Sequence, residues 1–142
     1  MEAGDIYCRK NFYADPLTGE LLPKYLLFMA PTRGGDWVFR LLTSREHGRR
    51  REPPCFHGDP YPGYFLGTLG GPLVKDSWVD LRSCPDADVD DVRGLIMKGV
   101  MKLVSQLTGR QLRAALECTA AAADTTRQQE QAIRDLLVKL IS

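Results

Sequence analysis

Two short apolar runs separated by turn-forming residues constrain the fold of this chain more than any other feature. Residues 25–30 and 37–42 each have the length of a β-strand, and Pro31, Gly34 and Gly35 lie between them. An antiparallel hairpin is the simplest connection for such a pair of runs. We therefore expect a β-hairpin here, at the centre of a small β-barrel.

Polar residues stand at the open end of this expected hairpin. Lys24 begins the first run, whereas Thr43 and Ser44 follow the second. Antiparallel pairing brings the start of one strand beside the end of the next. A cation and two hydroxyl groups are then expected to meet beside the basic loop 45–51, and this combination suits the binding of a phosphate.

Length and charge indicate a single domain. With 142 residues, 44% of them hydrophobic, the chain can bury one core. We expect a β-barrel over residues 1–84 and a helical segment over 85–142, which packs on the barrel or on a dimer partner. The net charge of +1 excludes a protein that is basic overall, but arginines cluster in 45–51 and aspartates in 86–91.

The cysteines and the hydropathy pattern predict a soluble protein without a metal site. Cys8, Cys55, Cys84 and Cys118 lie far apart and form no Cys-x-x-Cys pair, so we expect no metal site and no cofactor. Reduced thiols in a cytoplasmic protein are the expected state. No apolar run reaches the ~18 residues that a membrane helix needs, and the acidic N-terminus is unlike a signal peptide, so no membrane association is expected.

The remaining strands and loops are predicted from alternation and from turn residues. Strands are expected at residues 4–8, 64–68 and 73–81, with loops at 11–22 and 45–62. The predicted fold class is mainly β with C-terminal helices (α+β), in which five or six antiparallel strands form the barrel. The aromatic side chains of the expected strands are assigned to the core.

The last third of the chain is predicted to be largely helical. Residues 89–107 have a helical apolar period, although Gly94 and Gly99 leave a short strand around residues 95–97 as an alternative. Thr108 and Gln111 have the spacing of a capping box, which predicts a helix over 109–123. A final helix follows a cap within 124–126 and carries an apolar stripe, whose residues are Ile133, Leu136, Leu137 and Leu140.

The order of several short motifs resembles the MazF/PemK-like toxins of bacterial type II toxin–antitoxin systems. The motifs are residues 4–7, 19–20, 24–28, 41–44 and 75–79. The resemblance covers about residues 4–82 and implies an SH3-like barrel, usually a homodimer. It further implies cleavage of single-stranded RNA without a metal or cofactor, leaving a 2′,3′-cyclic phosphate, and an antitoxin protein that blocks the RNA groove.

The resemblance also suggests roles for individual residues. Lys24 occupies the place of the family's catalytic arginine, with Pro23 before it instead of after it. Lysine keeps the charge but lacks the planar fork that binds phosphate through two hydrogen bonds. Thr43 matches the family's hydroxyl at the end of the third strand. Some members also use an Arg and an Asp on the strand that matches residues 78–82. In this sequence the two residue types occur in the reverse order, as Asp80 and Arg82.

Metal-free RNA cleavage needs proton transfer and donors for the charge that develops on phosphorus. The candidate catalytic residues are Lys24, Thr43, Ser44 and His47, of which His47 has an ordinary pKa suited to proton transfer near neutrality. His57, in the same loop, is expected to be an ordinary loop histidine. The candidate RNA-binding residues are Arg33, Arg45, Arg49, Arg50, Arg51, Asp80 and Arg82.

The sequence is also compatible with a second function. The chain would then be an SH3-like barrel that binds RNA or a protein partner without cutting. The lysine at position 24 is the feature that separates these two functions, because it is the departure from the family's catalytic pattern.

Overall fold

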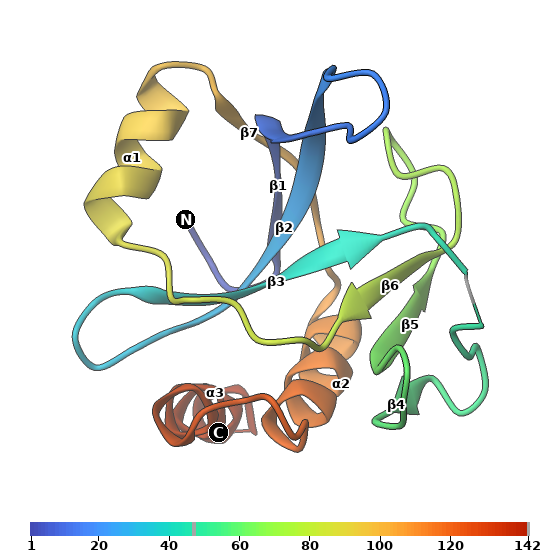
Figure 1. Ribbon diagram of the computed structural model, residues 1–142. Coiled ribbons are helices and arrows are strands. Elements are labelled where there is room, and N and C mark those ends of the chain that lie inside the picture. Colours follow the sequence, from blue (N-terminus) through green and yellow to red (C-terminus); the bar gives the residue numbers. More distant parts are fainter. Residues whose placement is uncertain (47, 142) are drawn as a thin grey trace.

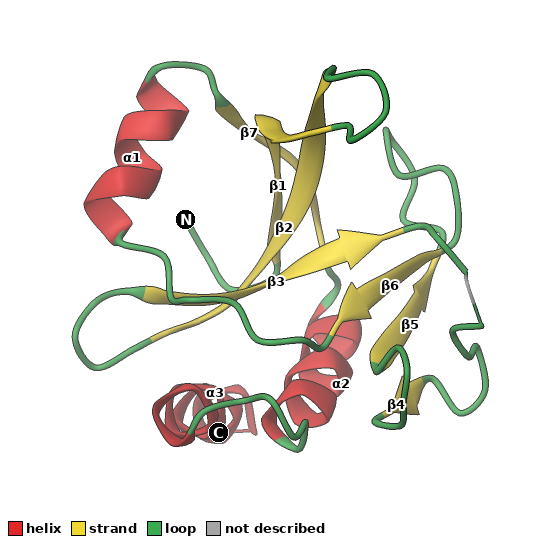
Figure 2. Ribbon diagram, viewed as in Figure 1, coloured by secondary structure: helices red, strands yellow, loops and turns green. Residues whose placement is uncertain are grey.

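The computed structural model describes residues 1–46 and 48–141 and contains one antiparallel sheet with helices on both of its faces (Figure 1). The sheet has the strand order β4-β5-β6-β3-β2-β1-β7. Figure 2 shows the same arrangement coloured by secondary structure. The elements are β1 (Asp5–Ala14), β2 (Leu21–Pro31), β3 (Trp37–Thr43), β4 (Cys55–Phe56), β5 (Gly63–Gly67), β6 (Ser77–Asp80), α1 (Val89–Met97), β7 (Met101–Gln106), α2 (Gly109–Ala120) and α3 (Arg127–Ile141).

The predicted central hairpin is confirmed. β2 and β3 pair antiparallel, with Tyr25 opposite Leu42. Successive residues of β2 point to opposite faces, and both faces are buried: Leu27 packs in the core with α2 and α3, and Leu26 and Phe28 pack in a second core beneath α1. Burial on both faces explains why this strand is a continuous apolar run.

The fold class is confirmed at the level of a mainly β, antiparallel protein with C-terminal helices. The sheet has seven strands where five or six were predicted. β4 and β7 are its two ends, and within residues 1–46 and 48–141 no ladder joins them, so the sheet is not closed into a barrel.

The expected loop at residues 11–22 is wrong for half of its length. β1 continues to Ala14 and β2 already begins at Leu21, so the turn between them is short. Asn11 has a φ of 54° inside β1, where the register to β2 shifts. The chain accommodates Asn11 in this bulge, and β1 continues to Ala14.

The helix expected over residues 89–107 ends at Met97, and residues 95–97, where a short strand was the alternative, are helical. Asp88 caps α1, its side chain accepting hydrogen bonds from the backbone N–H groups of Asp90 and Asp91. The helix ends before Gly99, whose φ of 74° favours glycine. The chain then forms β7, which pairs with β1. The strand predicted for 73–81 is shorter, being limited to β6.

The two C-terminal helices begin as predicted. Thr108 and Gln111 form the capping box of α2, which ends at Ala120 instead of at residue 123. Thr126 and Gln129 exchange the same pair of hydrogen bonds at the start of α3. Of the predicted apolar stripe, Ile133 and Leu137 are buried in the main core and Leu136 packs against it, whereas Leu140 is exposed.

One prediction about the cysteines is wrong. Cys55 of β4 and Cys118 of α2 are joined by a disulfide, and Cys8 and Cys84 are free thiols. The cysteine partners are 63 residues apart in sequence, so their proximity depends on the tertiary fold and not on local spacing. Among the described helices, none has the length and apolar character needed to cross a bilayer.

Candidate functional site

A cavity of about 340 Å³ opens at the end of the central hairpin where the polar residues were expected. Its lining combines charged side chains, a hydroxyl group and three aromatic rings. The lining residues are Phe12, Tyr13, Lys24, Thr43, Arg45, Arg49, Tyr61, Asp80 and Arg82. We call this cavity the basic pocket.

The strand register brings the first of these groups together. Lys24 precedes Tyr25 on β2, and Thr43 follows Leu42 on β3, so the pairing of Tyr25 with Leu42 places Lys24 and Thr43 at the same end of the hairpin. Thr43 pairs on its other side with β6, at Trp78. Because β6 ends at Asp80, this pairing also places Asp80 and Arg82 beside Thr43 in the pocket.

Thr43 has a hydroxyl proton available for a ligand. Its Oγ1 accepts a hydrogen bond from the backbone N–H of Arg45, at 3.2 Å. A hydroxyl group can accept and donate at the same time. Because Oγ1 is used as an acceptor in this contact, its own proton can be donated into the pocket.

Arg49 is a buried cation in the wall of the pocket. It is 8% exposed, its Nη1 donates to the backbone carbonyl of Arg45 at 2.7 Å, and its guanidinium lies 4.6 Å from the ring centroid of Tyr61. Its Nε has no hydrogen-bond partner in the described structure. Burial lowers the pKa of Arg49, with Asp80 opposing that effect.

Asp80 is the carboxylate of the basic pocket, and Arg82 holds it. Arg82 Nε lies 3.0 Å from Oδ1, and its Nη2 lies 2.6 Å from Oδ2. Burial raises the pKa of Asp80, but the hydrogen bonds and the charge of Arg82 outweigh burial and leave that pKa below its usual value. The carboxylate is therefore ionised near neutral pH and orients Arg82.

Lys24 has an unusual electrostatic setting. Its pKa is lowered, first by burial and further by the charges of Arg45, Arg49 and Arg82, while Asp80 acts in the opposite direction. Lysine pKa values shift readily when the ammonium group loses water. Lys24 therefore gives up its proton more easily than an exposed lysine does.

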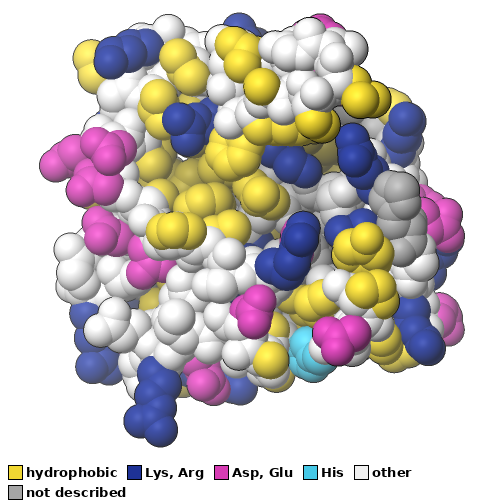
Figure 3. Space-filling view, viewed as in Figure 1, with side chains coloured by type: hydrophobic (Ala, Val, Ile, Leu, Met, Phe, Trp, Pro, Cys, Tyr) yellow, Lys and Arg dark blue, Asp and Glu magenta, His cyan; other side chains and the backbone are white. Residues whose placement is uncertain are grey.

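The balance of charge in the pocket suits an anion. Among the described lining residues, Lys24, Arg45, Arg49 and Arg82 supply four cations against the single carboxylate of Asp80. Figure 3 shows Lys and Arg side chains gathered around a hollow on the right-hand half of this face. Cations held in a concave, partly dehydrated wall attract phosphate more strongly than the same charges in open solvent.

Three aromatic residues of the pocket were not predicted as site residues. Phe12 and Tyr13 lie in the part of β1 that was expected to be a loop, and Tyr61 follows the arginine-rich loop. Aromatic side chains beside cations are typical of surfaces that stack nucleic-acid bases. The sequence feature that could have indicated these residues is the pair of adjacent aromatic residues Phe12 and Tyr13 within a polar stretch.

Four of the predicted site residues lie outside the basic pocket. Ser44 lines a neighbouring cavity of about 130 Å³. Arg33 is at the opposite end of the hairpin, 3.4 Å from Asp135 of α3. Arg50 lies over the ring of Phe56, and Arg51 makes ion pairs with Glu46 and Asp76. His47 lies outside the described residues.

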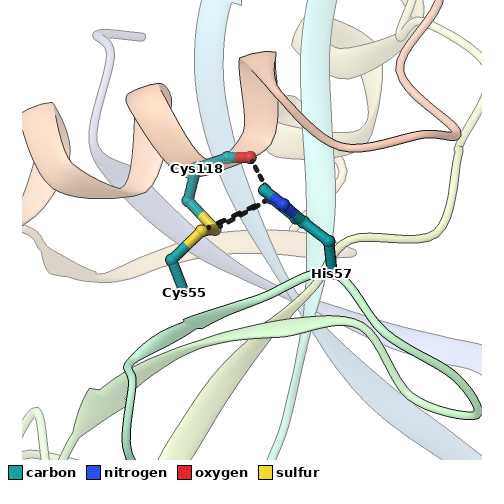
Figure 4. A group of neighbouring side chains, drawn as sticks. All are labelled: Cys55, His57 and Cys118. Atoms are coloured by element: carbon teal, nitrogen blue, oxygen red, sulfur yellow. Dashed lines mark hydrogen bonds between the residues drawn. A yellow bond between two sulfur atoms is a disulfide. The ribbon is translucent and has the colours of Figure 1, made fainter.

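His57 belongs to a different group of side chains. Its Nε2 lies 3.4 Å from Cys55 Sγ and 3.6 Å from Cys118 Sγ (Figure 4). Among the residues that the structure describes, these three form the group whose ligand atoms are close enough to hold a metal ion. Sequence reasoning missed this group because Cys118 is distant in the chain.

Comparison with known proteins does not identify a family for this chain. No family model matches the chain, and no solved structure matches it. A protein of Beauveria bassiana (strain ARSEF 2860) named "Oxidoreductase OpS5" is 32% identical over 66 residues, which are 46% of this chain. The chain covers 11% of the length of that protein, so the comparison leaves the function to be argued from the site.

Proposed function

We propose that this protein is a metal-independent endoribonuclease that cuts single-stranded RNA, with an SH3-like fold and an activity like those of the MazF/PemK-like toxins. The observation that supports the proposal most is the basic pocket, in which Lys24 and Thr43 lie together with Asp80 and Arg82. These are the residues for which the family resemblance implies catalytic or RNA-binding roles.

The pocket offers the groups that such a reaction requires. In this reaction the 2′-hydroxyl of a ribose passes its proton to solvent water while its oxygen attacks the adjacent phosphorus, and the 5′-oxygen of the next nucleotide leaves and takes up a proton. Negative charge grows on the non-bridging oxygens, where donors from the protein are most effective. The hydroxyl of Thr43 and the guanidinium of Arg82 are suited to this role, with the charge of Arg49 beside them.

Lys24 is suited to protonate the departing 5′-oxygen. Efficient proton transfer requires a group whose pKa is closer to the working pH than that of an ordinary lysine, and burial lowers the pKa of Lys24. The products would be one fragment with a 2′,3′-cyclic phosphate and one with a 5′-hydroxyl. Donating a proton in this way does not require the planar guanidinium of an arginine with its two parallel N–H donors.

The surface around the pocket also suits a single strand. Phe12, Tyr13 and Tyr61 can stack on unpaired bases while the cations bind the backbone. Bases that are paired in a duplex do not expose their faces in this way. We therefore expect a preference for single-stranded over double-stranded RNA.

The test is incubation of the purified protein with defined single-stranded RNAs in the presence of EDTA. Cleavage is expected, with cyclic-phosphate and 5′-hydroxyl ends, and DNA of the same sequence should remain intact. The Lys24→Ala/Thr43→Val double variant, purified in the same way, controls for contaminating ribonucleases. Cleavage that requires a divalent metal or leaves 5′-phosphates would contradict the proposal.

A non-catalytic RNA-binding or protein-binding barrel is the second candidate, because the family's arginine is a lysine here. Binding of RNA with no cutting of any tested sequence would favour it. We also propose that the protein acts in the cytoplasm as a homodimer and that an antitoxin protein covers the RNA surface. Sedimentation analysis of the protein alone tests for the homodimer. The same measurement with the product of a neighbouring small reading frame added tests for the antitoxin.

A further inference from the structure

A cluster of two cysteines and one histidine lies outside the basic pocket. Cys55 is on β4, His57 follows two residues later, and Cys118 comes from the last turns of α2 (Figure 4). Their ligand atoms all lie within 4.8 Å of one another. Cys118 is buried, whereas His57 is exposed, so the cluster spans from the core to the solvent.

The position of the imidazole matches that of a metal ligand. Zinc binds thiolate at about 2.3 Å and imidazole at about 2.0 Å in a tetrahedron, which separates a sulfur from a nitrogen ligand by about 3.5 Å. His57 Nε2 lies 3.4 Å from one sulfur and 3.6 Å from the other. The nitrogen therefore already stands at ligand distance from both sulfurs.

We infer that Cys55, His57 and Cys118 form a Zn²⁺ site in the reduced protein, and that the disulfide is the oxidised, metal-free state of the same site. Two thiolates and an imidazole are a ligand set that favours zinc. On reduction the two sulfurs, bonded to each other in the oxidised form, have to separate to about 3.8 Å. Rotation of the two cysteine side chains, whose Cα atoms are 5.7 Å apart, provides this movement.

The interconversion balances with a dithiol as reductant. The dithiol becomes a disulfide and gives two electrons and two protons to the Cys55–Cys118 bond, which yields two thiols. Zn²⁺ then replaces the two thiol protons, which pass to the solvent, and binds the Nε2 lone pair of His57. Oxidation by a disulfide reverses both steps and releases the metal.

One hydrogen bond has to be exchanged. His57 Nε2 lies 3.0 Å from the backbone carbonyl of Cys118, and since that oxygen can only accept, Nε2 carries the proton in the oxidised form. In the zinc-bound form Nε2 binds the metal, and the ring proton moves to Nδ1. The histidine stays in place and changes its partner.

A pocket beside His57 gives a metal ion a route to the cluster. A cavity of about 210 Å³ is lined by His57 together with the carboxylates of Asp59 and Asp124, and Arg82 lies at its wall. The two carboxylates attract cations toward the histidine side of the cluster. With three protein ligands, the fourth coordination position of the ion is expected to hold water.

The experiment measures metal binding by the full chain in a Cys8→Ser/Cys84→Ser background, where Cys55 and Cys118 are the remaining thiols. The protein is reduced with a dithiol, freed of reductant without oxygen, and titrated with Zn²⁺ against a chromophoric chelator. One Zn²⁺ per chain is expected in the reduced form and none in the oxidised form. Co²⁺, used as a probe, should give thiolate charge-transfer bands and intense tetrahedral d–d bands.

Variants separate a three-ligand site from a simple pair of thiols. His57→Asn, which changes an exposed side chain, should weaken Zn²⁺ binding by about 10–100-fold or more, and Cys55→Ser should weaken it further. Glu117→Gln, next to Cys118 but outside the cluster, should leave the affinity unchanged. Reduced protein that binds Zn²⁺ no better than Cys55→Ser, or a His57→Asn variant with unchanged affinity, would overturn the inference.

Discussion

The guanidinium of Arg40, fully buried in β3, donates a hydrogen bond to the side-chain carbonyl of Gln129 on α3, at 3.1 Å. Gln129 in turn donates to the carbonyl of Cys84 and to the carboxylate of Asp86. Arg40 also donates to Phe39 and to Thr125. This network ties the last helix to the centre of the sheet by polar contacts.

The first prediction is that Gln129→Ala destabilises the protein by about 1–3 kcal/mol, because a buried charged donor loses its acceptor. Urea unfolding followed by circular dichroism measures the change. Gln131→Ala, on the same helix but exposed and bonded to Asp135, should change the free energy of unfolding by less than about 0.5 kcal/mol. If the two variants unfold alike, the network does not stabilise α3.

The second prediction concerns the hydroxyl of Thr43. Thr43→Val should lower the rate of RNA cleavage by about 100-fold, because a donor to the developing charge is lost. Thr43→Ser keeps the hydroxyl and should retain most of the activity. Ser44→Ala, which changes a residue of the neighbouring cavity, should cut like the parent. Equal rates for Thr43→Val and Ser44→Ala would remove Thr43 from the site.

The third prediction is a pH dependence of RNA binding. Lys24 has a lowered pKa, so its charge is lost as pH rises through a value below the ordinary lysine pKa of about 10.4. Affinity for an uncleavable 2′-deoxy strand, measured by fluorescence anisotropy, should fall in that range. In Lys24→Arg the charge persists over this range, so the fall in affinity should disappear. An identical pH profile in both proteins would contradict this role.

The fourth prediction separates the arginines by their position. Arg45→Ala should reduce the slope of log affinity against log salt concentration by about 0.7, the value for one phosphate contact of a single strand. Arg33→Ala, at the other end of the hairpin and paired with Asp135, should leave the slope unchanged. A slope that responds to Arg33 and not to Arg45 would place the RNA on the opposite end of the molecule.

The fifth prediction concerns the acid stability that Asp80 provides. Its pKa is lower in the folded protein, so its stabilising contribution is complete above the ordinary Asp pKa of about 3.9 and is lost as pH falls through the lowered value. The parent should exceed Asp80→Asn by about 1–3 kcal/mol near pH 7, and the two should converge in acid. A difference that grows on acidification would contradict the stated sign.

Local patterns were sufficient to predict the elements whose causes are local. The central hairpin follows from two apolar runs and their turn, and α2 follows from the capping box of Thr108 and Gln111. The meeting of Lys24 with Thr43 follows from antiparallel register alone. These features need no knowledge of contacts that are distant in the chain.

Features that depend on distant contacts were not predicted. The strand β7 forms because β1 offers it an edge, which its own sequence does not reveal. The place of Tyr61 in the basic pocket depends on Arg49, and the pairing of Cys55 with Cys118 depends on how α2 packs against β4. In each case a contact between separate parts of the fold decides the outcome.

The bond between Cys55 and Cys118 divides the chain topologically. The closed covalent ring contains β5, β6, α1 and β7, whereas β1, β2, β3 and α3 lie on its two tails. If the protein were pulled from its ends, the ring would stay closed and would withhold about 200 Å of contour length, since an extended chain spans at most ~3.3–3.6 Å per residue. Lys24 and Thr43 lie on a tail and Asp80 and Arg82 in the ring, so mechanical force would divide the basic pocket between the part that extends and the part that does not.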